Sequence, residues 1–121
     1  MKIKPILIVA GEPKSTFFEI FFKSLQKGKF KSPLLLITSI KLLRSQMRRF
    51  GFKKKVMLIN LENIYNSKLS NKHINVINVN YEKKNKSKNY IKNCFKIAFK
   101  ILKHSITDKF INGPINKSNF L

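Results

Sequence analysis

Two short apolar segments, each followed at once by glycine and proline, constrain the fold of this chain more than any other feature. Residues 6–10 (Ile-Leu-Ile-Val-Ala) run into Gly11-Glu12-Pro13, and residues 110–112 (Phe-Ile-Asn) run into Gly113-Pro114. Glycine supplies backbone freedom and proline restricts φ, so each segment is typical of a strand that ends in a turn. The strands of a parallel sheet end at one edge, and α/β proteins bind ligands in a crevice there. We therefore expect the two strands to lie near each other, with Gly11 and Gly113 at the same edge.

Strand and helix patterns alternate along the rest of the chain, which predicts an α/β fold: a layered sheet with flanking helices in one domain. Apolar runs predict strands at residues 3–10, 33–38, 56–59, 73–81 and 109–112. The first, second and last should be buried, and the fourth should lie closer to an edge because its alternate residues are polar. Helical spacing predicts helices starting at 15 or 16, 39 and 90 and ending at Gly28, Gly51 and 103, with Thr16 and Glu19 forming a capping box. Residues 61–69 should be irregular and 82–89 a loop.

The net charge of +21 suggests a nucleic-acid partner, because a basic surface releases the counterions of phosphates when it binds. The composition favours another explanation. Almost all the positive residues are lysine, and lysine, asparagine, isoleucine and phenylalanine share A/T-rich codons, so mutational bias of the genome accounts for all four. The arginines, which read bases and phosphates best, are Arg44, Arg48 and Arg49 alone. We expect no specific nucleic-acid binding, and a small basic nucleic-acid-binding α/β module remains the alternative function.

Other sequence features limit the chemistry. No run of about 18 apolar residues is present, and the N-terminal apolar run is too short for a signal peptide, which favours a cytoplasmic protein without a membrane partner. His73, His104 and Cys94 do not make a metal site, since two isolated histidines lack a third ligand and the cysteine lies on an apolar helical face. The Gly11-Glu12-Pro13 loop before a helix could bind a phosphate or be an ordinary turn. Lys117 could reach an anion in the crevice or be a solvated lysine.

The two motifs, taken together, resemble a known family. Residues 6–10 with Gly11-Glu12-Pro13 and Glu19 resemble the opening of the 4-hydroxythreonine-4-phosphate dehydrogenases, in which a Gly-Asp/Glu-Pro loop leads into a helix carrying a glutamate. The helix at 90–103 and the strand that ends in Gly113-Pro114-Ile-Asn-Lys117 resemble that family's helix, strand and Gly-Pro-x-x-Lys turn. The family loop continues Ala-Gly-Ile-Gly-Pro-Glu, whereas this chain has Lys-Ser-Thr-Phe-Phe at 14–18.

The resemblance implies the first subdomain part of a fold like that of the isocitrate and isopropylmalate dehydrogenases, with the active site in a cleft between two subdomains of a homodimer. It implies NAD-dependent oxidation of the 3-hydroxyl of a phosphorylated substrate in vitamin B6 biosynthesis, assisted by a divalent metal (Zn, Mg or Co). Candidates for the substrate cleft are Gly11, Glu12, Pro13, Gly113, Pro114 and Lys117.

The family's histidine-threonine pair, its metal-binding histidines and its nicotinamide-binding segment lie beyond the point that matches Leu121. We therefore interpret residues 1–121 as a single incomplete α/β domain, the N-terminal portion of a longer dehydrogenase. Alone, it is expected to bind neither NAD nor metal and to be inactive.

Overall fold

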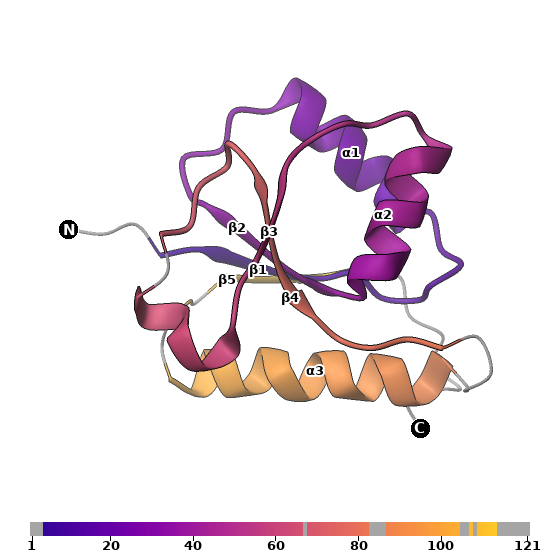
Figure 1. The fold of residues 1–121 in the computed structure, drawn as a ribbon. Helices are drawn as coiled ribbons and strands as arrows, with labels where there is room; N and C mark the ends of the chain where they lie inside the picture. The colour runs from indigo at the N-terminus through magenta and orange to yellow at the C-terminus, as the bar shows by residue number, and fades with distance from the viewer. Residues whose placement is uncertain (1–3, 67, 83–86, 105–106, 108, 114–121) are drawn as a thin grey trace.

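A parallel sheet with helices on both faces makes up the computed structural model, which describes residues 4–66, 68–82, 87–104, 107 and 109–113 (Figure 1). Within these residues the strands are β1 (Ile6–Val9), β2 (Leu34–Thr38), β3 (Val56–Leu58), β4 (Ile74–Asn78) and β5 (Lys109–Asn112). The helices are α1 (Phe17–Lys27), α2 (Ile40–Arg49), α3 (Ser87–Lys103) and the 3-10 helix η1 (Leu61–Asn66). The predicted α/β class is confirmed. None of the described helices is long and apolar enough to cross a membrane.

The strands are ordered β3-β4-β2-β1-β5, and each neighbouring pair is parallel. In register, Ile6 of β1 lies between Leu34 of β2 and Lys109 of β5, and Val9 lies beside Asn112. The first and last strands of the described chain are therefore direct neighbours, as the two turn motifs predict. Their carboxyl ends meet at one edge of the sheet.

Two helical layers bury the two faces of the sheet (Figure 1). On the face covered by α1 and α2, the core is built largely from aromatic rings, including Phe17, Phe18, Phe21, Phe22 and Phe52. On the face covered by α3, the core includes Tyr90, Ile91, Cys94, Ala98 and Ile101, together with Ile64 of η1. Because both faces are covered, β1 and β2 are continuous apolar runs rather than alternating ones.

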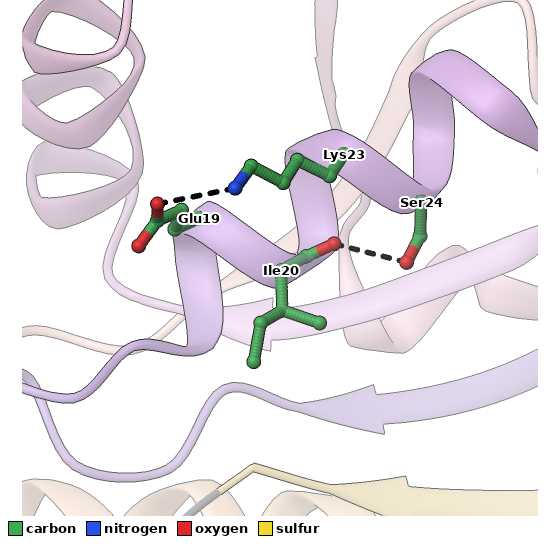
Figure 2. Close-up of polar contacts among 4 residues, drawn as sticks. All are labelled: Glu19, Ile20, Lys23 and Ser24. Atoms are coloured by element: carbon green, nitrogen blue, oxygen red, sulfur yellow. Dashed lines mark hydrogen bonds and ion pairs between the residues drawn. The ribbon is translucent and has the colours of Figure 1, made fainter.

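The predicted capping box at the start of α1 is wrong. Thr16 is the N-cap residue but its side chain makes no capping bond, and its ψ of 4° departs from the extended backbone that a capping side chain needs. The Oγ of Ser15 instead accepts from the N–H of Phe17 at 3.3 Å. Glu19 points along the helix and pairs with Lys23 one turn on, at 3.3 Å, while Ser24 donates to the carbonyl of Ile20 at 2.9 Å (Figure 2). A capping box would need the carboxylate of Glu19 to bond back to the start of the helix, and Lys23, four residues on, competes for that carboxylate.

Three further expectations need correction. Residues 61–69 are irregular only in part: 61–66 form η1, with a kink at Asn63, whereas 68 and 69 belong to no helix or strand. Ile64 of η1 is buried, and the Asn60 side chain accepts from the N–H of Glu62 at 3.0 Å at the start of η1. Helix α3 begins at Ser87, within the predicted loop. Strand β5 is an edge strand of the described sheet rather than a buried one, with Ile111 54% exposed.

Candidate cleft wall at the carboxyl edge of the sheet

The loop that follows β1 is shaped by Gly11 and Pro13. Gly11 has φ of +85°, a conformation that residues with a Cβ rarely adopt, so a glycine is required where the chain leaves the strand. The N–H of Ser15 then donates to the carbonyl of Glu12 at 3.1 Å and closes a turn. Gly11 and Pro13 are buried and the Glu12 side chain is half-buried, so the loop folds back over the sheet edge before α1 begins.

Gly113 lies directly against Ala10 and Phe17, the residues on either side of this loop. Its N–H donates to the carbonyl of Val9 at 2.7 Å and so continues the β1–β5 pairing one residue beyond the strand. A Cβ built on Gly113 would overlap the carbonyl oxygen of Ala10 and would lie 2.9 Å from Cδ1 of Phe17. The absence of a side chain is thus what allows Gly113 to approach Ala10 and Phe17 so closely. Of the candidate residues, Gly11 and Gly113 lie at the same edge of the sheet, where Gly113 contacts Ala10, and Glu12 and Pro13 follow Gly11 in the loop. Pro114 and Lys117 lie outside the described residues.

A polar cluster that the sequence reasoning missed lies at the same edge, where β2 ends. The hydroxyl of Tyr90 is 2.9 Å from Oγ1 of Thr38 and accepts from the N–H of Ser39 at 3.1 Å. The Oδ1 of Asn78, at the end of β4, accepts from the N–H of Ile40 at 2.8 Å. These contacts tie α3 and β4 to the start of α2. The signal available in the sequence was a tyrosine, rather than a phenylalanine, at the start of an apolar helical face.

Burial governs the ionisation of this cluster. Thr38 and Ser39 are almost fully buried, and burial raises the pKa of the Tyr90 phenol well above its usual range. Burial likewise raises the pKa of the Cys94 thiol to about 12. Both groups therefore stay neutral at physiological pH and do not act as a nucleophile or a base there. The cluster holds the backbone at the start of α2 in place, and its members do not serve as catalytic groups.

Neither a metal nor a dinucleotide fits the groups gathered here. In the part of the chain that the structure describes, no three histidine, cysteine, aspartate or glutamate residues come close enough to hold a metal ion. The β1–α1 loop has a single glycine, not the Gly-rich turn whose backbone approaches a pyrophosphate. One α1 N-terminal donor, the N–H of Phe17, is already bonded to Ser15. What the edge offers is a closely packed backbone surface, a wall against which a ligand held by other groups can lie.

The fold and this edge define the class of protein: an α/β protein with a parallel sheet whose candidate site lies at the carboxyl ends of the strands. No protein-family model and no curated protein matches the sequence.

Solved structures do match the fold. The chain is similar to a 4-hydroxythreonine-4-phosphate dehydrogenase from Burkholderia phymatum, with a TM-score of 0.81 and 18% identity over 99% of this chain. It is also similar to the enzyme of that name from Klebsiella pneumoniae (TM-score 0.79, 19% identity, 97% of this chain). A putative one from Salmonella typhimurium gives a TM-score of 0.78 with 17% identity over 97% of this chain. The chain spans 39% of the length of each of these proteins. The resemblance indicated by the two turn motifs is thus confirmed in the fold.

Proposed function

We propose that this chain is the N-terminal portion of a 4-hydroxythreonine-4-phosphate dehydrogenase, a cytoplasmic and homodimeric enzyme of vitamin B6 biosynthesis, and forms one wall of its substrate cleft. The observation that carries the proposal is the packing of Gly113 against Ala10 and Phe17, the residues on either side of the β1–α1 loop, at the carboxyl edge of the sheet. The two segments are far apart in the sequence, and each carries one of the motifs that resemble the family. The fold shared with the three dehydrogenase structures supports it.

In this role the described residues would shape the wall of the cleft and exclude water from it, and they would take no part in the chemical step. The packed backbone of Gly11, Pro13 and Gly113 would form a water-excluding surface beside a phosphorylated substrate, and Glu12 and Lys117 are the charged candidates nearest to it in sequence. NAD would accept the hydride, and a divalent metal would be held by groups outside those described. Because the family's metal-binding histidines lie beyond the point that matches Leu121, residues 1–121 alone should not turn over substrate.

The proposal is tested with the complete reading frame that encodes these residues. The purified product is assayed for NADH formation with 4-hydroxythreonine 4-phosphate and a divalent metal, beside residues 1–121 alone. We expect NADH from a product that supplies the family's histidines, and none above a metal-free blank from residues 1–121. Turnover by residues 1–121, or a folded product that carries those histidines and makes no NADH, would contradict the proposal.

A further inference from the structure

A cavity of about 560 Å³ lies between the second half of α2 and the start of β3, at the amino-terminal edge of the sheet. Four positively charged side chains line it: Arg44, Arg48, Lys53 and Lys54. Its apolar lining comes from Met47, Phe52 and Val56, of which Phe52 is buried and the other two half-buried. The volume is within the range of small-molecule sites, which are mostly apolar with a few convergent polar groups.

The way α2 ends builds this arrangement. Gly51 has φ of +61°, the N–H of Phe52 donates to the carbonyl of Met47 at 2.9 Å, and the N–H of Gly51 donates to that of Arg48 at 3.3 Å. These paired bonds are a Schellman motif, which reverses the chain tightly at a helix end. The reversal places Lys53 and Lys54 across from the helix, while Phe52 stacks on Phe22 in the core at 4.6 Å between ring centroids. Phe52 therefore forms a fixed apolar wall beneath the charged groups.

The charges of the cavity are not neutralised within the described residues. Arg44 and Arg48 are four residues apart and project from one side of α2. No carboxylate among the described residues lines the cavity, and none of its four cations is ion-paired to one of them. The C-terminal end of α2 contributes a partial negative charge of about one half, which is small beside four full positive charges. The net potential favours an anion.

Composition alone does not account for this site. Exposed lysines lie on helices of both layers, such as Lys23 and Lys27 of α1 and Lys96 and Lys100 of α3, as expected for a lysine-rich chain. The arginines do not follow that distribution, because all of them lie within residues 44–49 and two of them line the cavity. Arginine presents a planar fork that binds phosphate or carboxylate in two places, which lysine cannot do.

The geometry points to a binding site for a small amphiphilic anion: an aromatic or aliphatic body that packs on Phe52, Met47 and Val56, with a phosphate or carboxylate held by Arg44 and Arg48. Binding here does not depend on the proposed dehydrogenase role, since none of the described residues near Gly11 or Gly113 lines the cavity.

The probe is 1-naphthyl phosphate, titrated calorimetrically into the full chain at about 0.15 M salt, where the screening length is about 8 Å. Inorganic phosphate tests the anion alone and 1-naphthol the apolar body alone. We expect 1-naphthyl phosphate to bind at least about tenfold more tightly than either, because only it uses both parts of the cavity. Affinity no better than that of inorganic phosphate would overturn the inference.

The matched variants are Arg44→Gln with Arg48→Gln, and Lys92→Gln with Lys96→Gln. Each pair removes two exposed positive charges, but Lys92 and Lys96 lie on α3, on the other face of the sheet (Figure 1). The arginine pair should weaken 1-naphthyl phosphate binding by about tenfold and the lysine pair by less than about twofold. If both pairs weakened 1-naphthyl phosphate binding equally, the ligand would be held only by the general attraction of an anion to a positively charged protein. A single-stranded oligonucleotide that binds through the arginines and is not displaced by 1-naphthyl phosphate would identify the surface as a polyanion site instead. Either outcome overturns the inference.

Discussion

The backbone N–H of Gly113 donates to the carbonyl of Val9 at 2.7 Å, and this bond joins the last described residue of the chain to its first strand. The bond lies at the carboxyl end of both β1 and β5, and the structure leaves no room there for a side chain at Gly113. One glycine thus determines both the end of the β1–β5 pairing and the shape of the candidate cleft wall.

Gly113→Ala should lower the free energy of unfolding by about 3 kcal/mol or more, because the new methyl group overlaps the carbonyl of Ala10 and must displace backbone. Gly51→Ala is the matched control. Its Cβ would meet nothing within 4 Å, so only the positive φ of 61° opposes it, at a cost of about 1 kcal/mol. Urea denaturation of both variants gives the comparison. Equal costs would mean that the close contact at Gly113 is not the constraint.

Tyr90→Phe should destabilise the protein by about 1–3 kcal/mol, because it leaves the buried N–H of Ser39 and the hydroxyl of Thr38 without their partner. Tyr81 serves as the control, since its ring packs 5.2 Å from that of Tyr90 but no described residue hydrogen-bonds to its hydroxyl. Tyr81→Phe should change stability by less than about 0.5 kcal/mol. Thermal denaturation of the two variants under one condition separates these effects, and a neutral Tyr90→Phe would show that water replaces the lost bonds.

The main features of the fold could be predicted because they depend on burial, which shows directly in the residue pattern. Uninterrupted apolar runs indicated that β1 and β2 are buried strands, and apolar residues at helical spacing indicated α1 and α3. The pairing of β1 with β5 followed from two turns of the same kind. Local hydrogen bonds were less predictable: the expected capping box has the right residue types, but Glu19 bonds to Lys23 instead.

The candidate site was predictable only where backbone conformation determines it. Gly11 and Gly113 are recognisable because few residues other than glycine fit there. The role of Tyr90 depends on its hydroxyl contacting Thr38 and Ser39, which are 52 and 51 residues away in the sequence. A single sequence does not show that these residues meet. The grouping of Arg44 and Arg48 with Lys53 and Lys54 depends on the Schellman turn at Gly51, so a composition argument that treats all basic residues alike does not find it.

Stability at alkaline pH should depend on Cys94. Its pKa is raised from 9.0 to about 12 by burial, so the folded state holds the proton where the unfolded state has released it. The resulting stabilisation is fully present below the unfolded pKa and is lost as pH rises towards the folded one, by about 1.4 kcal/mol per pH unit. Urea unfolding between about pH 8 and pH 11 should therefore show a steeper decline for the native chain than for Cys94→Ala. Parallel curves would show that the thiol ionises equally in both states.

Two asparagines of β4 should respond in opposite ways to replacement by aspartate. Asn75 is 1% exposed, and its Nδ2 donates to the carbonyls of Leu34 at 2.9 Å and Ser70 at 3.1 Å. Asn78 is exposed, and its Oδ1 accepts from the N–H of Ile40 at the start of α2. The sequence analysis placed this strand closer to an edge because its alternate residues are polar. The structure corrects this, because β4 lies between β3 and β2, and only Asn78 of its five residues is exposed. The two asparagines are three residues apart and so point to opposite faces of the strand.

Asn75→Asp replaces a donor by an oxygen that faces two carbonyls and buries a charge, so we expect a loss of about 3 kcal/mol or more at neutral pH. The buried carboxyl should have a raised pKa, and part of the loss should be recovered as pH falls and the protonated group can donate again. Asn78→Asp keeps its acceptor and adds a negative charge at a helix N-terminus, which should be neutral or stabilise by up to about 1 kcal/mol. Urea unfolding of both variants at about pH 7 and pH 5 tests the pair. A loss at Asn75→Asp that does not diminish on acidification would mean that the carbonyls of Leu34 and Ser70 move away from the new side chain rather than facing it.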